Sequence, residues 1–393
     1  MDPGTGGGGA KKPRTSPAAA PPVAALGDDL LREILLWLPD MASLANAACV
    51  DTRWYGVASD PAVFRRFNAL RRPPLLGFIL TDRGDQLFPR RCSELTFIRA
   101  TRGYPRLASA AAKADFYFQD LPVDPDAVDD EWRLRGCSGG RLLLSRGYNG
   151  LVLAVYDPIA RTATYLHPCN IDVFRYSIHM VRYAIVVDEA DGSFLVIGVV
   201  DFQAAVFSSR SDRRTFEDEN MFWSIYNIPA DGMAAGRFAY WRSDTKKNKR
   251  YDLVERILVL YTTTMEWSVI TAPFPPGESY CVADMPEHGG LCLFSSKEQC
   301  LQLWVHNSTG EWVLKEEFSL MDERMKKLRR DEWMKRVRIL AARAGYVYME
   351  FWSIRKPNSY LLVLNLRTKK MDMFPNNSND PYRGPAFPFF MRV

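Results

Sequence analysis

The chain has 393 residues, of which 47% are hydrophobic and 25% charged, so its apolar content excludes wholesale disorder and supports at least one sizeable core. Its net charge of +5, from 51 basic and 46 acidic side chains, is small for this length and gives no support to nucleic-acid binding. Seven cysteines without a C-x-x-C pair favour reduced thiols, hence the cytoplasm or nucleus. No apolar run reaches the roughly 18 residues of a membrane-spanning helix. We therefore expect no nucleic-acid and no membrane partner.

Residues 1–24 are mostly Gly, Pro, Ala and Lys, with few apolar side chains to offset the entropy of ordering. This composition predicts a disordered tail.

Residues 26–68 have the spacing of short amphipathic helices. Leu30, Ile34 and Leu38 follow one another at four-residue steps, and Pro39 predicts the end of this first helix. Three further short helical segments follow. The stretch carries more large apolar groups than such helices can bury among themselves, which favours burial against a partner protein. The alternative is an ordinary helical cap docked on the rest of the chain.

Acidic residues mark the expected starts of these helices. Either Asp28 or Asp29 is expected to cap the first helix, and Asp40 the second, because a side-chain oxygen accepts from the free amides at a helix N-terminus.

A larger set of residues in this stretch carries a resemblance to a known family. In chain order the set reads Leu26, Asp29-Leu30-Leu31, Glu33-Ile34-Leu35, Leu38-Pro39, Ser43-Leu44, Val50, Arg53-Trp54, Ser59-Asp60-Pro61 and Phe64. It resembles an F-box, the small helical motif that docks on the Skp adaptor of cullin-based ubiquitin ligases. Two positions depart from the family: Gly27 stands where proline is usual, and Asp51-Thr52 replaces a cysteine and a basic residue.

The resemblance assigns residues 25–70 to an F-box domain and implies a set of adaptor-contacting side chains. These are Leu26, Leu30, Ile34, Leu38, Pro39, Leu44, Val50 and Trp54. Trp54 and the Leu38-Pro39 step are expected to matter most, since large aromatics in desolvated pockets dominate interface energies.

Residues 75–393 have a different pattern of apolar and polar residues. Short apolar runs alternate with polar or Gly/Pro turns, as in LLGFIL, LVLAVY, SFLVIGVV, RILVLY and LLVLNL. Such runs are typical of strands, and the lack of regularly alternating helices favours an all-β domain over a parallel α/β sheet.

A repeat runs through this β region. Glycines that open apolar strands recur at intervals of 44 to 55 residues, namely Gly140, Gly192, Gly236, Gly290 and Gly345. This period is close to the roughly 50 residues of a kelch-like blade. The fold class expected is therefore mainly β, with the helical motif followed by a β-propeller of about six blades, and the C-terminal segment is expected to pair with the first blade. An irregular double sheet is the alternative. The repeat also resembles the F-box-associated propeller domains of plant F-box proteins.

One segment breaks the β pattern. Residues 319–340 are strongly basic and place several apolar side chains at helical spacing, which predicts a helix inserted between strands.

The sequence shows no catalytic, metal or cofactor motif, so none of these is expected. Four histidines lack the spacing of a zinc site, and no nucleophile elbow or phosphate-binding loop is found. The leading hypothesis is a non-catalytic, substrate-recruiting subunit of a Skp-cullin-F-box ubiquitin ligase, with an unknown protein substrate on the propeller. A propeller enzyme and an F-box scaffold outside a ligase remain alternatives.

Overall fold

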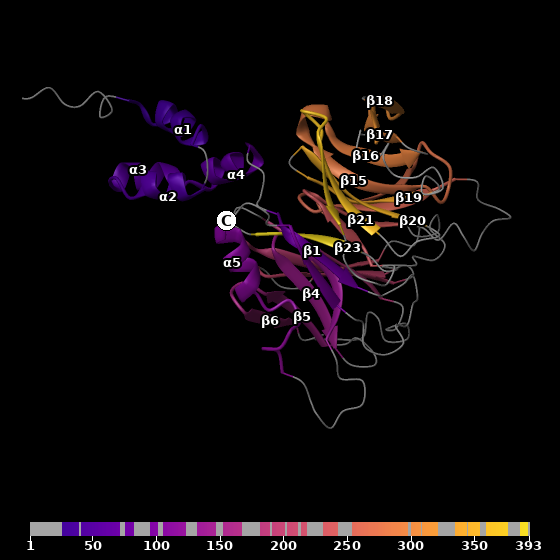
Figure 1. Ribbon diagram of the computed structural model, residues 1–393, viewed down its shortest axis with the longest axis horizontal. Coiled ribbons are helices and arrows are strands. Elements are labelled where there is room, and N and C mark those ends of the chain that lie inside the picture. The colour runs from indigo at the N-terminus through magenta and orange to yellow at the C-terminus, as the bar shows by residue number, and fades with distance from the viewer. Residues whose placement is uncertain are drawn as a thin grey trace, which may run out of the picture. The chain divides into compact units, whose positions relative to one another are not determined.

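The chain divides into two units, Met1–Phe67 and Asn68–Val393, and each is described by itself (Figure 1). The computed structural model describes residues 26–38, 41–70, 75–81, 95–100, 105–122, 132–146, 152–166, 181–188, 191–200, 203–210, 214–217, 231–242, 254–297, 300–307, 309–320, 335–343, 345–353, 359–375 and 386–391. The predicted disordered tail, residues 1–24, lies outside the described residues.

The first unit, called the helical unit below, consists of short helices around one small core. Its helices are α1 (Asp28–Leu36), α2 (Met41–Ala48), α3 (Thr52–Ala58) and α4 (Pro61–Leu70). The buried side chains of its core are Leu31, Leu35, Leu36, Leu44, Val57, Ala58, Val63 and Phe67. Every helix from α1 to α4 contributes to this core, which explains how such short helices hold together.

The helix starts differ in part from the sequence prediction. The N-cap of α1 is Gly27, at φ −67°, and Asp28 and Asp29 lie in the first turn, where their charge complements the helix dipole. Asp51 caps α3, because its Oδ1 accepts from the Trp54 backbone amide at 2.9 Å. The predicted cap Asp40 lies outside the described residues.

The second unit is a six-bladed β-propeller, as the glycine repeat predicts (Figure 1). The first blade holds β2 (Leu95–Arg99), β1 (Leu75–Thr81) and β23 (Ala386–Phe390). The second blade holds β3 (Arg133–Ser138), β4 (Arg141–Arg146), β5 (Val152–Asp157) and β6 (Thr162–Leu166). The third blade holds β7 (Arg182–Val187), β8 (Phe194–Val200), β9 (Gln203–Ser208) and β10 (Arg214–Glu217). The fourth blade holds β11 (Met233–Ala235), β12 (Phe238–Arg242), β13 (Arg256–Tyr261) and β14 (Glu266–Thr271). The fifth blade holds β15 (Ser279–Met285), β16 (Gly290–Lys297), β17 (Cys300–His306) and β18 (Trp312–Ser319). The sixth holds β19 (Lys335–Arg343), β20 (Tyr346–Ser353), β21 (Ser359–Asn365) and β22 (Met371–Pro375).

The C-terminal strand closes the ring, which confirms the expected pairing with the first blade. β23 pairs antiparallel with β1, with Ile79 opposite Phe387 and Gly77 opposite Phe389. The first blade therefore combines strands from both ends of the β region, and closure covers the edge that β1 would otherwise expose.

The five repeated glycines share one structural position. Each lies at the connection between the first and second strands of its blade, and each has a positive φ: Gly140 (75°), Gly192 (73°), Gly236 (54°), Gly290 (109°) and Gly345 (74°). Residues with a Cβ rarely adopt such angles, so the tight inner hairpin selects glycine at this point of every repeat.

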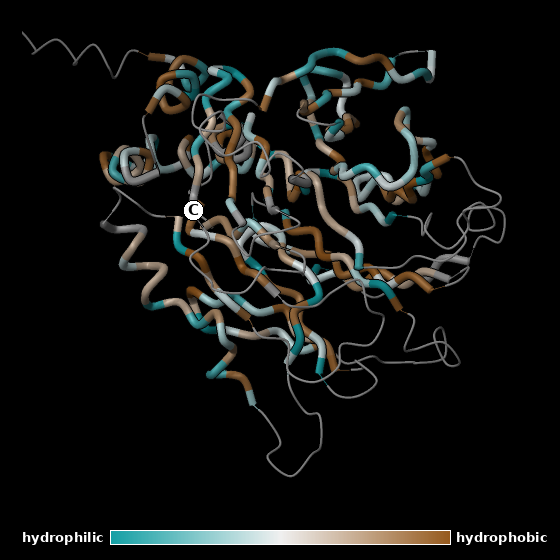
Figure 2. The backbone as a smooth tube through the Cα atoms, turned by 45° about the vertical axis from the view of Figure 1, so that its right-hand side comes forward, coloured by the Kyte–Doolittle hydropathy of each residue, from teal (hydrophilic) through white to brown (hydrophobic). Residues whose placement is uncertain are grey.

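Apolar packing between blades builds the propeller core. Six clusters of buried side chains join adjacent blades, and the sixth joins the last blade to the first through Tyr348, Val363, Phe78 and Phe390. Figure 2 shows this pattern as hydrophobic stretches along the strands. The ring is thus held together by the same apolar runs that predict strands in the sequence.

Two helical segments accompany the strands, and one predicted helix is partly wrong. α5 (Pro105–Lys113) packs on the first and second blades through Ala111, and η4 (Pro286–His288) forms a turn of the fifth blade. The helix was predicted over residues 319–340, but residues 335–340 belong to strand β19 (Lys335–Arg343), which pairs with β20. Residues 321–334 lie outside the described residues.

Candidate functional site

The helical unit leaves a stripe of large apolar side chains exposed on α1. Leu30 is 57% exposed, Ile34 is 40% exposed, and Trp37, directly after the helix, is 82% exposed. At 100° per residue these three positions fall within an arc of about 60°, away from the buried Leu31 and Leu35. They form what we call the α1 stripe, an apolar surface that the unit's own core does not cover.

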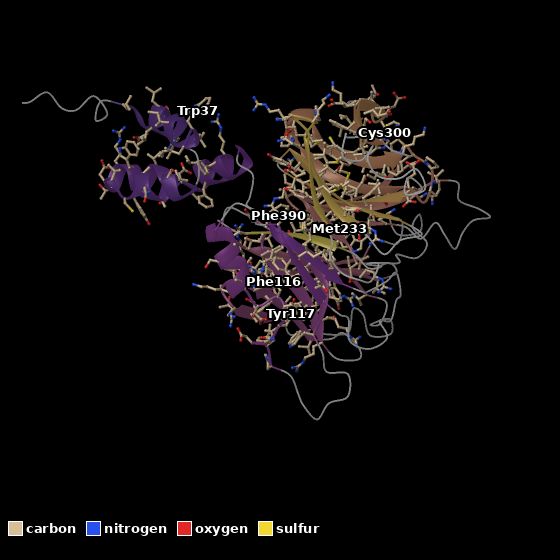
Figure 3. The ribbon with its side chains drawn as sticks, viewed as in Figure 1. Trp37, Phe116, Tyr117, Met233, Cys300 and Phe390 are labelled. Atoms are coloured by element: carbon tan, nitrogen blue, oxygen red, sulfur yellow. The ribbon has the colours of Figure 1, made fainter. Side chains whose placement is uncertain are left out.

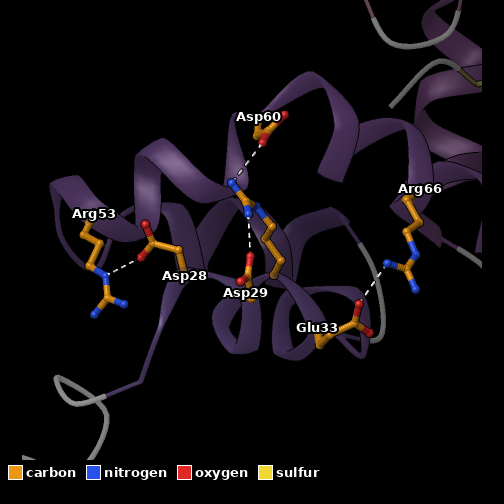
Figure 4. Close-up of polar contacts among 7 residues, drawn as sticks. Asp28, Asp29, Glu33, Arg53, Asp60 and Arg66 are labelled. Atoms are coloured by element: carbon orange, nitrogen blue, oxygen red, sulfur yellow. Dashed lines mark hydrogen bonds and ion pairs between the residues drawn. The ribbon is translucent and has the colours of Figure 1, made fainter.

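Other positions of α1 are tied to the rest of the unit by ion pairs (Figure 4). Asp28 accepts from Arg53 of α3 at 2.8 Å, and Glu33 accepts from Arg66 of α4 at 2.8 Å. Arg53 also donates to the Leu26 carbonyl. Because most of these side chains are exposed, each pair stabilises the fold by at most about 1 kcal/mol. Their main effect is to fix the orientation of α1 and hence of its stripe.

The sequence-predicted contact residues divide into three groups in the structure. Leu30, Ile34 and Val50 are exposed. Leu26, Leu38 and Trp54 are half-buried, and the last two pack against the core of the unit. Leu44 is only 3% exposed and belongs to that core, so it stabilises the helical unit and is not itself part of its surface. Pro39 lies outside the described residues.

Two exposed aromatic residues of the helical unit were missed by the sequence reasoning. Trp37 projects from the end of α1 (Figure 3), and Tyr55 on α3 is 62% exposed. A signal for Trp37 was present, because it lies seven residues after Leu30 and so continues the same helical face. For Tyr55 the spacing gives no comparable signal.

The inner strands of the propeller hold a different kind of cluster. Arg135 of β3 donates to Asp231 at 2.8 Å and to the Val181 carbonyl at 3.0 Å. The same Asp231 oxygen accepts from the backbone amide of Tyr183 on β7 at 3.0 Å, and the Arg135 guanidinium lies 5.0 Å from the Tyr183 ring centre. Burial raises the pKa of the Tyr183 hydroxyl to about 12, which keeps it neutral. This cluster binds three successive blades together near their inner edges.

Within the described ranges, no three His, Cys, Asp or Glu side chains converge as ligands of one metal ion. No helix in the same ranges combines the length and the apolar character needed to cross a bilayer.

Comparison with known proteins adds only remote likenesses. No family model matches the chain, and no curated protein matches it. Among solved structures, a member of the DUF4221 family from Bacteroides vulgatus is 11% identical, with 65% of this chain and 84% of that chain covered and a TM-score of 0.36. TolB from Acinetobacter baumannii is 11% identical over 74% of this chain and 63% of its own, with a TM-score of 0.35. The tricorn protease is 13% identical over 65% and 27%, with a TM-score of 0.35. The propeller assignment rests on the order of the strands, and these likenesses indicate no function.

Proposed function

We propose that the helical unit is an F-box that docks on the Skp adaptor of a cullin-based ubiquitin ligase, and that the propeller recruits a protein to be ubiquitinated. The α1 stripe carries this proposal. A stripe of three large exposed apolar residues on a small helical unit is suited to an apolar groove of a partner. The F-box resemblance of the surrounding sequence selects the Skp adaptor as that partner.

The proposed contribution to ubiquitination is proximity. A subunit that holds its substrate near a ubiquitin-charged enzyme raises the effective concentration of substrate lysines, and it needs no bond chemistry of its own. We accordingly propose a non-catalytic role, exercised in the cytoplasm or nucleus. The plant F-box proteins with associated propeller domains are the family to which this role would assign the chain.

The test is the affinity of the full chain for purified Skp adaptor, measured by calorimetry. Replacing Ile34 by Asp places a charge in the centre of the α1 stripe, and Trp37→Ala removes its largest side chain. Each change is expected to weaken binding by tenfold or more, since a hot-spot truncation costs about 2 kcal/mol and 1.4 kcal/mol is a factor of ten.

Matched controls separate loss of the interface from loss of the fold. Val313 on β18 is 47% exposed, similar to Ile34, so Val313→Asp introduces the same charge on the propeller and should leave adaptor binding unchanged. Trp54→Ala is a poorer probe than Trp37→Ala, because Trp54 packs against the helical core and its loss also loosens the unit. Absence of wild-type binding, or equal affinities of wild type and both stripe variants, would refute the proposal.

A further inference from the structure

The tight turns of the propeller share one face. Within each blade consecutive strands run antiparallel, so the turn between the first and second strands and the turn between the third and fourth emerge at the same end. In the fourth blade these turns are 236–237 and 262–265, and in the fifth they are 286–289 and the described residues 307 and 309–311. Turns of two neighbouring blades therefore lie next to each other.

A pocket of about 430 Å³ opens between these four turns. Its apolar lining consists of Phe238, Tyr261 and Leu291, and the first two rings meet edge to face with centres 5.0 Å apart. The volume is in the range of pockets that hold small organic molecules or single side chains. The lining suits a flat or branched apolar group.

Arg237 forms one wall of the pocket and is held in place by the neighbouring blade. Its Nε and Nη2 donate to Asp284 at 2.9 Å each, and its backbone amide donates to the same carboxylate at 3.1 Å. Asp284 is 11% exposed and Arg237 is 53% exposed. The Asp284 carboxylate thus holds the Arg237 guanidinium in one orientation. The Nη1 atom of Arg237 has no hydrogen-bond partner among the residues that the structure describes.

The remaining polar groups of the pocket favour ligands that accept hydrogen bonds. Thr263, His306 and Asn307 complete its rim, and each carries at least one N–H or O–H group in its side chain. The lining includes Arg237 and His306 but no aspartate or glutamate, and Asp284 pairs with Arg237 from outside the lining. Asp284 already accepts from Nε and Nη2 of Arg237, so the guanidinium, held with little further loss of conformational entropy, offers Nη1 to an acceptor such as a carboxylate oxygen.

We propose that this pocket binds a carboxylate joined to an apolar group, with Arg237 as the carboxylate donor and Phe238 and Tyr261 as the apolar contact surface. The carboxylate can come from a free small acid or from an acidic side chain next to a hydrophobic residue in a polypeptide. The site lies wholly within the propeller and does not depend on the helical unit.

The experiment measures binding of matched acid and amide probes to the full chain by ligand-observed NMR titration. Phenylacetate is compared with phenylacetamide, and the blocked dipeptide Phe-Glu with Phe-Gln. The acids are expected to bind about tenfold more tightly than the amides, because charge-assisted hydrogen bonds are the stronger ones. Tighter binding of Phe-Glu than of phenylacetate identifies a polypeptide as the source, and the reverse order identifies a free acid.

Two substitutions test the pocket in independent ways. Arg237→Gln removes the carboxylate donor, and Thr263→Trp fills the opening from an exposed turn while the Arg237 and Asp284 residues stay in place. Both should reduce acid binding at least tenfold, whereas Arg367→Gln, in the turn between the third and fourth strands of the sixth blade, should not. If Arg237→Gln fails to fold, Thr263→Trp decides. Equal binding of acids and amides, undiminished binding to Thr263→Trp, or no binding of either acid by the wild type would overturn the proposal.

Discussion

The two units of this chain bury their apolar residues in different ways. In the propeller, six clusters lie between adjacent blades, and the ring is closed so that every blade has a neighbour on both sides. The helical unit has one small core. Of the eleven large hydrophobic side chains that are exposed among the described residues, five belong to this much smaller unit. The comparison teaches that the propeller covers its apolar surface by closing its ring, whereas the helical unit leaves apolar side chains that its own core does not cover.

The largest test of this comparison removes the closing strand. Deleting residues 386–393 takes β23 away from β1 and uncovers Phe78 and Ile79, so the propeller should lose cooperative unfolding and aggregate. Thermal melting and light scattering measure the effect. Deletion of residues 1–24 is the matched control and should leave the melting temperature unchanged. A truncated propeller with the melting temperature of the full chain would show that closure is dispensable.

The next test compares one largely buried ion pair with one exposed pair. Asp231→Ala leaves the Arg135 guanidinium and the Tyr183 amide without their carboxylate partner inside the ring, which should lower the free energy of unfolding by about 3 kcal/mol. Asp28→Ala breaks the exposed pair with Arg53 in the helical unit and should cost at most about 1 kcal/mol. Chemical denaturation of both variants measures the difference. Similar losses would contradict the contrast between the two units.

A third test uses a buried carboxyl group of the sixth blade. Burial raises the pKa of Glu350 to about 7, although Arg338 at 3.7 Å acts in the opposite direction. A carboxyl pKa raised above its unfolded value of about 4.3 means that this contribution to stability is complete below pH 4 and is lost as the pH rises to 7.

Glu350→Gln keeps the volume but removes the titration. The variant should therefore be more stable than wild type at pH 8, by on the order of 2 kcal/mol, and equal to it near pH 4. Melting temperatures measured across this range check the sign, with the exposed Glu287→Gln as control. A variant that is less stable than wild type at pH 8 would mean that the charged form is favoured in the folded protein.

The smallest expected effect concerns the start of α1. Gly27 has φ −67°, an angle that proline also adopts, and a side chain there meets nothing within 4 Å. Gly27→Pro should stabilise α1 by about 0.4–1 kcal/mol, because it restricts the unfolded chain. Hydrogen exchange of the α1 amides should slow by about two- to fivefold. Gly56→Pro, inside α3, is the opposite control and should accelerate exchange. Faster exchange in Gly27→Pro would disprove the assignment of Gly27 as a relaxed N-cap.

The propeller architecture was predictable because each blade carries its own sequence pattern, with apolar runs for the strands and a glycine at the first hairpin. A positive φ at the inner hairpin selects glycine in five blades, so Gly192 and Gly345 mark a period that is visible in the sequence. The exception is the end of the helix predicted over residues 319–340, because residues 335–340 instead belong to β19 and pair with β20. Tertiary pairing of this kind leaves no mark in a single segment.

The candidate sites were less predictable, since they depend on which face of a helix or which turns meet. The F-box resemblance implies that both Leu44 and Leu30 contact the adaptor. Only the packing of the helices shows that Leu44 is buried and Leu30 exposed. The pocket depends on Arg237 and Asp284, which are 47 residues apart and meet only because two blades are neighbours. No spacing rule connects such a pair.

The pairing of β1 with β23 also sets the order of events during synthesis. The ribosome makes β1 more than 300 residues before its inner partner, which at 5 to 20 residues per second is a delay of about 15 to 60 s. The helical unit precedes both strands in the chain and can fold on its own core during that interval. A nascent chain would therefore present its α1 stripe well before its propeller ring is complete.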